Sequence, residues 1–412
     1  MHIIAVAGAM ESHLPLPLPT PSSPLKMPPF IYSRMDELKK TFVASLFFGF
    51  IAGALAMSMP LFLDSQGFSL SGIGSILAAA TLIGGLIGIY IGAHTDVAGR
   101  KKMLSALTFL QAGAVLLMVF FKNAFSYLIA ESGRKFSSNT RWSLFISRFT
   151  DLTKRKERGK YLGYFTAAFG LSFAFAHFVA GWIFQQFGPD FLFLLVSALS
   201  ILMGILILTF REAPSKKGPP KPRISLELLR TRSGIANAIV SFMNGSQRSI
   251  IYGFAIYLFM SNTYSFTPGE IGIYTSIFLT VWGVSSYFLG KLIDAGGTLK
   301  TLLSGSAINA SIWVAAAFFQ QWEVFFLLML FENLTYPLYG VSTIKISSIL
   351  AHRENTGRDV QIFGYFDIVG AMLGVFIAGL LAEISFSYVF LMRAIMTISS
   401  ALVAYLFINL ED

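Results

Sequence analysis

The stretch "GAHTDVAGRKK", residues 92–102, contains four charged side chains: Asp96, Arg100, Lys101 and Lys102. It separates two apolar runs, residues 72–91 and 103–121, neither of which contains a charged residue. An apolar run of about 20 residues is long enough to cross the hydrocarbon core of a membrane as a helix. The stretch therefore predicts a polar loop at a membrane surface, between two transmembrane helices.

The composition of the whole chain supports this interpretation. Hydrophobic residues make up 55% of the 412 residues and charged residues 13%, whereas a soluble globular protein has about 25% charged residues. We therefore predict an all-α polytopic membrane protein. The chain has no cysteine, which excludes disulfides and thiolate metal sites. Its five histidines are never at metal-ligand spacing, so no cofactor is expected, and His177 is expected to be a packed, hydrogen-bonded residue.

Twelve candidate membrane spans follow residue 41. Their approximate bounds are 42–63, 71–92, 103–121, 125–150, 161–184, 190–210, 235–261, 269–290, 299–319, 323–350, 360–383 and 386–408. The longest connection is basic and contains proline, and it divides the spans six and six. We predict a disordered cytoplasmic tail (1–40), an N-terminal six-helix bundle (41–210), a cytoplasmic linker (211–233) and a C-terminal six-helix bundle (234–410). Whether residues 1–34 belong to the natural protein stays open, because Met35 could be the start.

Lysine and arginine are distributed very unevenly between the two sides of this topology. The loops and tail on the side of the termini contain 23 of them, whereas the six opposite loops contain one, Lys122. Such a bias orients membrane proteins with their basic loops in the cytoplasm, so we expect both termini to be cytoplasmic and the protein to lie in the plasma membrane. The net charge of +10 is then explained by topology, and no nucleic-acid partner is expected.

The charged loop recurs at a fixed interval of 198 residues. Gly74, Gly92, Asp96 and Gly99 correspond to Gly272, Gly290, Asp294 and Gly297. The triplets "RGK" (158–160) and "AGW" (180–182) correspond at the same interval to "TGR" (356–358) and "AGL" (378–380). One offset from the second span to the fifth predicts two six-helix halves related by a pseudo-twofold axis. Secondary transporters with such repeats bind substrate near the membrane midplane, between the halves.

The sequence resembles the major facilitator superfamily. The resemblance rests on "GAHTDVAGRKK", which is similar to the loop between the second and third helices of that family, and on "KERGKYLG" (156–163). The second copy, "GKLIDAGGTLK" (290–300), keeps both glycines and the aspartate but lacks the arginine. The resemblance covers about residues 40–410. It implies the twelve-helix fold, a monomer, and a central cavity formed by helices one, four, seven and ten.

The resemblance also implies a role for the two loops in gating. In the family, the first loop latches onto the eleventh helix, which here begins near Arg358, while the cytoplasmic side is closed. Asp96 suits this role, because a carboxylate is stabilised at a helix N-terminus by about 0.3–1 kcal/mol. The residues expected to take part are Gly92, Asp96, Gly99, Arg100, Gly290, Asp294 and Gly297. For Lys101 and Lys102, topology alone is the preferred explanation.

The fourth span contains charges that other spans lack: Glu131, Arg134, Lys135 and Arg141. A charge near the centre of a membrane helix costs about 2.5–3.5 kcal/mol on insertion scales, so such residues face a bundle interior or a wet cavity. These four lie on one broad helix face. The alternative is that Glu131 and Lys135, one turn apart, form a neutral pair that merely helps insertion. Arg148 and Lys345, near the cytoplasmic ends of their helices, are expected to extend to the surface.

Two further spans offer polar residues to the cavity. The seventh has Asn244, Arg248 and Tyr252, and the tenth has Glu332 and Tyr336. Arg134 and Glu332 are 198 residues apart, which predicts that they form an ion pair, or compete for substrate, across the cavity. Asp367, in the eleventh span, is either a proton carrier or the partner of a base on a neighbouring helix.

The excess of arginine and lysine in this region predicts an anionic substrate, because guanidinium groups bind carboxylates and phosphates with paired hydrogen bonds. The expected ligands are Arg134, Lys135, Arg141, Asn244, Arg248 and Tyr336, and the expected coupling residues are Glu131, Glu332 and Asp367. The function this suggests is proton-coupled secondary transport of a small organic anion by alternating access. The alternatives are a multidrug or metabolite exporter, which His177 disfavours by replacing a proline typical of such exporters, and a non-transporting receptor. No catalytic constellation points to an enzyme.

Overall fold

The computed structural model describes residues 29–92, 99–153, 157–211, 228–350 and 356–409, and these are nearly all helical. The helices are α1 (Pro29–Ser65), α2 (Leu70–Gly92), α4 (Arg100–Phe120), α5 (Ala124–Leu152), α6 (Arg158–Leu208), η1 (Leu228–Arg230), α7 (Arg232–Ile250), the π-helical turn η2 (Ile251–Ala255), α8 (Ile256–Tyr264), α9 (Pro268–Gly296), α10 (Thr298–Phe318), α11 (Trp322–Leu350), α12 (Thr356–Ile384) and α13 (Phe386–Phe407). Local signals set several starts. At α9, for example, the Thr267 hydroxyl accepts the Glu270 N–H while the Glu270 carboxylate accepts the Thr267 N–H.

Nine helices in the described part of the chain are long and apolar enough to cross a membrane. One of them, α6, has 51 residues and would extend over about 76 Å as a straight helix, more than twice the hydrocarbon thickness. Gly188, with φ 81° and Pro189 after it, divides α6 into two spans. Helix α5 is too polar to be counted among these nine, and the segment α7–η2–α8 is divided by the π-helical turn into pieces that are not counted. With the two spans of α6, these two segments complete the twelve predicted spans.

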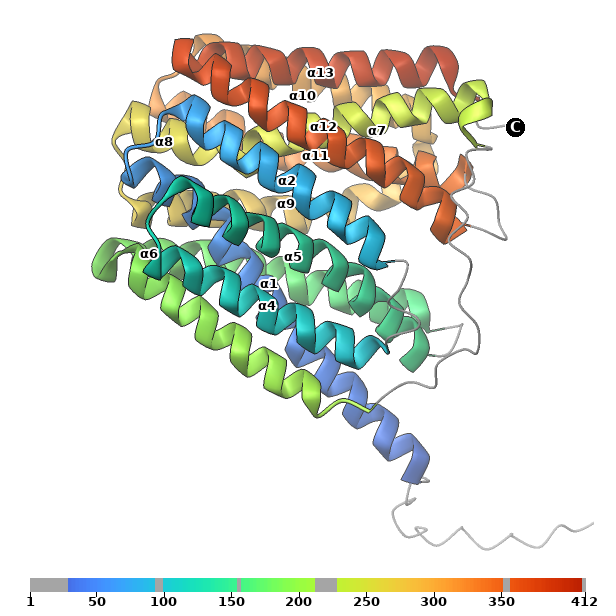
Figure 1. Cartoon of the computed structure of the whole chain (residues 1–412). Coiled ribbons are helices and arrows are strands. Elements are labelled where there is room, and N and C mark those ends of the chain that lie inside the picture. The colour runs from blue at the N-terminus through green and yellow to red at the C-terminus, as the bar shows by residue number, and fades with distance from the viewer. Residues whose placement is uncertain (1–28, 93–98, 154–156, 212–227, 351–355, 410–412) are drawn as a thin grey trace, which may run out of the picture.

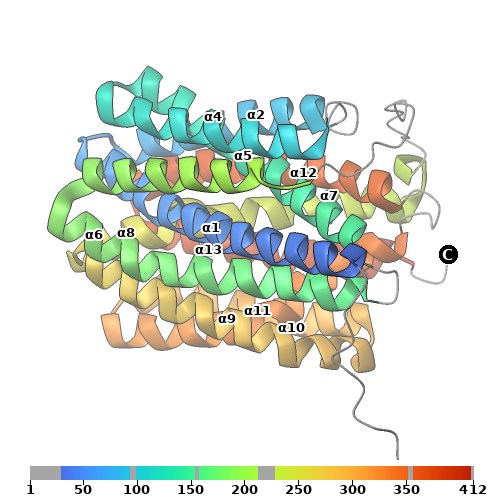
Figure 2. The same ribbon diagram turned by 90° about the horizontal axis from the view of Figure 1, so that it is seen from below.

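The helices form one bundle, and the start of α1 and the end of α13 lie at the same end of it (Figure 1). Before the linker, α1 packs on α6 and α5, and α4 packs on both of these. After it, α7 packs on α12 and α13, and α10 packs on α11 and α13. Figure 2, a view from below, shows the same parallel arrangement of the long helices. The domain boundaries stay a prediction, because 212–227, most of the proposed linker, lies outside the described residues.

The 198-residue repeat is visible in the backbone. Gly99 (φ 87°, ψ 127°) precedes α4, and Gly297 (φ 83°, ψ 128°) precedes α10 in the same conformation. Gly67 (φ 80°) and Ser265 (φ 56°), also 198 apart, share the left-handed region that favours glycine. The two halves therefore turn between helices in the same way at corresponding positions.

The halves meet through two equivalent pairs of helices, α2 with α12 and α6 with α9. A Cβ atom on Gly74 would lie 2.8 Å from the Cα of Gly379, and one on Gly272 would lie 3.1 Å from the Cα of Gly181. These contacts are related by the repeat, since Gly272 and Gly379 each follow their counterpart by 198 residues. Only glycine allows backbones to approach this closely.

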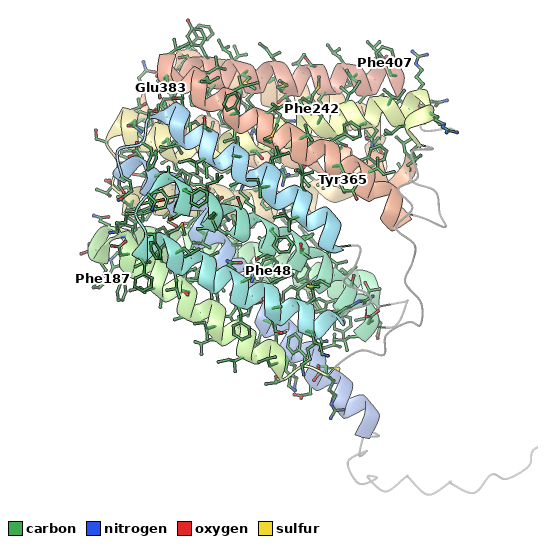
Figure 3. All side chains as sticks on the ribbon, viewed as in Figure 1. Phe48, Phe187, Phe242, Tyr365, Glu383 and Phe407 are labelled. Atoms are coloured by element: carbon green, nitrogen blue, oxygen red, sulfur yellow. The ribbon has the colours of Figure 1, made fainter. Side chains whose placement is uncertain are left out.

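Both glycine contacts lie toward the end of the bundle opposite the termini. Beside the first, the N–H and hydroxyl of Ser71 donate to Oε1 of Glu383 at 2.9 and 3.0 Å, and Glu383 is labelled at that end in Figure 3. The same view shows Phe48 inside the bundle and Phe187 at its edge. Phe187 is 57% exposed, as expected for a side chain that faces lipid.

A buried ion pair joins α1 to the ends of α5 and α6, near the termini. Arg148 donates to Oε2 of Glu37 at 2.5 Å, and the same oxygen accepts the backbone N–H of Arg211 at 3.0 Å. The guanidinium also lies 4.1 Å from the ring centroid of Phe210. The expectation that Arg148 extends to the surface is wrong, because it is 3% exposed. An acid from the first helix satisfies it within the protein.

Candidate substrate cavity

A cavity of about 180 Å³ lies where α1, α2, α5, α6 and η2 meet. Its polar wall comes from α5, with Glu131, Arg134, Lys135, Ser138 and Asn139. The rest of the wall is mostly apolar, including Phe169 and Phe173 of α6, and η2 contributes Tyr252 and Gly253. An apolar wall with a few convergent polar groups is typical of a small-molecule site. The volume is that of about six water molecules, which suits a small metabolite.

The charges on α5 leave the cavity with one extra positive charge. Both oxygens of Glu131 accept hydrogen bonds from Arg134, three residues later. Lys135 lies farther away, with its Nζ 4.0 Å from Oε1 of Glu131. Its side chain is 27% exposed, against 10% for Arg134 and 0% for Glu131. The closer pair is thus Glu131 with Arg134, rather than Glu131 with Lys135 as the sequence alternative had it.

A second charged group lies on the C-terminal helices. Arg248 of α7 donates to Oδ2 of Asp367 of α12 at 2.6 Å, and Asn244 donates to Oδ1 at 3.3 Å. The sequence predicts all three residues as site residues, and it offers Asp367 as either a proton carrier or the partner of a base on a neighbouring helix; in the structure Arg248 is that base. The Arg248 side chain is 54% exposed, and it is close enough to Lys135 to repel it electrostatically. Cations of the two halves therefore face each other.

The predicted ion pair between Arg134 and Glu332 is wrong. Glu332 accepts a hydrogen bond from Arg393 of α13 at 2.6 Å, and both side chains are fully buried. Asn309 of α10 donates to the same oxygen at 3.3 Å. Arg134 is satisfied one turn away on its own helix, so neither residue needs the other. The repeat gives corresponding positions, but it does not decide which neighbour is closer.

Arg393 is the site residue that sequence reasoning missed. It is a single arginine within the apolar run of α13. A charge at such a position is costly unless it is paired, and this cost is the signal that could have identified it. Its other terminal nitrogen donates to the backbone carbonyl of Gln247 on α7 at 2.7 Å.

Four of the six predicted ligands do not line this cavity: Asn244 and Arg248, which bind Asp367, and Arg141 and Tyr336. Arg141 is fully buried between α5 and α1, where its Nε donates to the Ser137 carbonyl at 3.2 Å and its guanidinium lies 4.8 Å from the ring centroid of Phe48. Tyr336 is 9% exposed, and its ring centroid lies 5.6 Å from the Arg393 guanidinium. Arg141 belongs to the N-terminal core, and Tyr336 lies beside the buried charge pair.

The predicted gating loops are partly described. Gly92 is the last residue of α2, and Arg100 opens α4, where it donates to the Asp151 carboxylate and to the Ser147 carbonyl of α5. Gly290 lies within α9 with open space around it, and Gly297 follows that helix. Asp96 and the side chain of Asp294 lie outside the described residues, so the latch stays a prediction.

His177 forms a link between the halves. Its Nδ1 lies 2.9 Å from the Phe173 carbonyl oxygen and its Nε2 lies 3.1 Å from the Tyr257 hydroxyl of α8. The prediction of a packed, hydrogen-bonded histidine is confirmed.

Comparison with known proteins agrees with this architecture. The model of the Major Facilitator Superfamily matches residues 41–240 and 237–412. An uncharacterised MFS-type transporter of Methanocaldococcus jannaschii is 23% identical over 380 residues, which is 89% of this chain and 95% of the relative. Among solved structures, a bacterial homologue of the human lysosomal transporter Spinster, inward-facing and occupied, has a TM-score of 0.76 at 14% identity, covering 91% of this chain and 96% of its own.

A D-xylose–proton symporter has a TM-score of 0.74 at 16% identity, covering 92% of this chain and 98% of its own. At these identities the solved structures are evidence of the fold alone. The family match extends over almost all the described residues. The chain therefore belongs to the major facilitator superfamily of membrane transport proteins.

Proposed function

We propose that the protein is a secondary active transporter that moves a small organic anion by proton-coupled alternating access. The observation that carries this proposal is the position of Lys135 in the cavity, without a close counter-ion among the described residues. Lys135 lines the cavity, and its nearest described carboxylate, on Glu131, is 4.0 Å away and already bonded to Arg134. A partly desolvated ammonium group without a close counter-ion attracts an anion more strongly than one in water, because the local dielectric constant is lower.

The surroundings of Lys135 suit a short carboxylate or phosphate ester. Ser138 and Asn139 offer hydrogen-bond donors on the same helix, and Phe169 and Phe173 form an apolar wall for a carbon skeleton. Arg248 adds positive charge from the other half of the molecule. An anion between Lys135 and Arg248 would reduce their repulsion, and it would favour closure of the two halves around it.

Glu332 and Asp367 are the proposed coupling residues. Each holds an arginine, Arg393 and Arg248 respectively, and protonation of the acid would release that arginine. A proton could thereby change both the packing of α13 and the charge facing the substrate. The similarity in fold to a D-xylose–proton symporter is compatible with this.

The topology that we propose places both termini in the cytoplasm and the protein in the plasma membrane as a monomer. Its support is the lysine and arginine bias of the sequence and the position of both described ends at one end of the bundle. In this topology the glycine contacts lie on the outer side of the membrane. The loops around Asp96 and Asp294 would then close the inner side in the opposite state.

The proposal is tested by a thermal-unfolding screen of the detergent-purified protein. The anions are lactate, succinate and glycerol 3-phosphate, and the matched controls are neutral glycerol and cationic choline. A ligand at about 100 times its Kd adds about 2.7 kcal/mol of stability. We expect at least one anion to raise the unfolding temperature, and Lys135→Gln to abolish that shift. Lys122→Gln is the control, because Lys122 pairs with Asp190 outside the cavity.

Stabilisation by choline or by lipophilic cations, with no effect of the anions, would contradict the proposal. Lys135 would then be part of a gate or scaffold, and the multidrug exporter would become the better account. Binding without transport in reconstituted vesicles would instead favour a receptor.

A further inference from the structure

The turn η2 interrupts the segment α7–α8 at the edge of the cavity. Its π-type bond runs from the N–H of Ile256 to the carbonyl of Ile251, five residues back, and the N–H of Ile251 bonds to Arg248. In a regular α-helix the N–H of Ile251 would bond to the carbonyl of Gln247. That carbonyl instead accepts the hydrogen bond from Arg393. The π-turn is thus tied to the buried charge pair, and such turns occur frequently at functional sites.

Tyr252, the second residue of this turn, connects the cavity to that pair. Tyr252 lines the same cavity as Lys135. Its hydroxyl lies 3.1 Å from Oε2 of Glu332 and 2.6 Å from Oδ1 of Asn333. A hydroxyl has one proton to donate, and here Oδ1 of Asn333 and Oε2 of Glu332 share it, so a substrate oxygen that accepts this hydrogen bond removes it from the buried acid as well.

Glu332 depends on its few partners because it is fully buried. The groups that face it are Arg393 from α13, Asn309 from α10, Tyr252 from η2, and Tyr336 on its own helix. Donated hydrogen bonds stabilise a carboxylate relative to the neutral acid. Loss of the Tyr252 bond therefore removes one of the few groups that stabilise the negative charge of Glu332, and a neutral Glu332 would no longer hold the Arg393 guanidinium.

We propose that Tyr252 is the positioning residue that transmits occupancy of the anion cavity to the buried Glu332–Arg393 pair. An anion at Lys135 draws the Tyr252 hydroxyl toward its own oxygen, and the hydroxyl keeps its proton. Glu332 then takes up the coupling proton, and Arg393 is freed to release the Gln247 carbonyl. This inference rests on the proposed function, and it names the path by which substrate and proton are coupled.

The first test separates substrate movement from proton coupling. The variant Tyr252→Phe removes the hydroxyl and keeps the ring. The matched control is Tyr339→Phe, because the Tyr339 hydroxyl bonds to Ser400 at 2.9 Å in the same half and does not line the cavity. Both variants are reconstituted into vesicles with the panel anion that gives the largest thermal shift. We expect Tyr252→Phe to keep equilibrium exchange of the anion and to lose accumulation driven by a proton gradient, whereas Tyr339→Phe keeps both.

The second test measures the protonation of Glu332 directly. Dicyclohexylcarbodiimide modifies protonated intramembrane carboxyl groups, and mass spectrometry of the labelled protein resolves Glu332 from Glu131. We expect the anion to increase modification of Glu332 in the wild type and in Tyr339→Phe, and to leave it unchanged in Tyr252→Phe.

Each outcome has a distinct meaning. Gradient-driven accumulation by Tyr252→Phe at the wild-type level, or anion-dependent labelling of Glu332 in that variant, would overturn the inference and leave the proposed function standing. Loss of both exchange and binding in Tyr252→Phe alone would also overturn it, since Tyr252 would then be a substrate ligand and no relay. A wild type that neither binds nor exchanges any panel anion would instead overturn the proposed function.

Discussion

At the scale of single residues, the buried pair Glu332–Arg393 sets the strongest constraint on the C-terminal half. Two charges removed from water cost several kcal/mol each, and their attraction compensates only while both partners are present. Arg393 also leaves its Nε without a hydrogen-bond partner among the described residues. The pair is therefore poorly tolerant of losing either member.

We predict that Glu332→Gln lowers the free energy of unfolding by about 3–5 kcal/mol, because it leaves Arg393 as an unpaired buried charge. The measurement is denaturant unfolding of the purified protein in detergent. Glu323→Gln, on the exposed first turn of the same helix, is the control and should change stability little. If the double variant Glu332→Gln/Arg393→Gln is no more stable than Glu332→Gln alone, the unpaired-charge explanation fails.

The candidate site could be predicted only in part from the sequence. The unusual charges of α5 and the polar stripe of α7 point to Lys135 and Arg248, because charges in apolar runs need a reason. Their partners could not be predicted, since pairing depends on how helices far apart in the chain are rotated against each other. Arg393 and the π-turn of Tyr252 were missed for this reason, and Arg141 turned into the core although it shares the charged face of α5.

At the scale of helices, the two glycine contacts hold the halves together at one end. A methyl group at Gly74 would meet the Cα of Gly379 at 2.8 Å and the Val375 carbonyl oxygen at 3.0 Å. Backbone atoms cannot rotate away as a side chain does. Overpacking of this kind costs about 1–3 kcal/mol, which is sufficient to shift an equilibrium between closed and open forms of that end.

We predict that Gly74→Ala opens the contact between α2 and α12 at the end of the bundle opposite the termini. Because the chain has no cysteine, cysteines at Ser71 and Glu383, which are hydrogen-bonded, can be cross-linked cleanly with a short bismaleimide. Cross-linking should be slower in Gly74→Ala than in the parent. Gly113→Ala, at a glycine with open space around it, should leave the rate unchanged. Equal rates in both variants would mean that the glycine contact does not control closure.

The buried ion pair between Glu37 and Arg148 leads to a separate prediction for α1. Glu37→Gln removes the acid that Arg148 and the Arg211 N–H share, and it leaves a buried arginine without that ion pair. We expect a fall in unfolding temperature, measured by thermal unfolding of the detergent-purified protein. Binding of the panel anion should be retained, because this ion pair lies outside the cavity. Asp36→Gln, at the exposed neighbouring acid, is the matched control. A large loss of anion binding in Glu37→Gln at unchanged stability would contradict a purely structural role.

At the scale of the whole molecule, most of the fold could be predicted from the sequence. The apolar runs predict the number of spans, and the 198-residue interval predicts two equivalent halves, because each half repeats the same glycine positions. The backbone at Gly99 and Gly297 and the paired glycine contacts are the physical form of that interval. The interval does not predict substrate specificity, because the charged residues differ between the halves. Arg134 corresponds to Glu332, and Lys135 corresponds to Asn333.

In the proposed transport cycle, the cavity at Lys135 carries an anion across the membrane at the expense of a proton gradient. The most direct test is uptake of the panel anions into vesicles containing the wild type, Lys135→Gln or Lys122→Gln, with a proton gradient imposed in either direction. We expect accumulation of at least one anion above its equilibrium level by the wild type and Lys122→Gln, and none by Lys135→Gln. Accumulation of a cationic or neutral compound instead, unaffected by Lys135→Gln, would contradict this cycle.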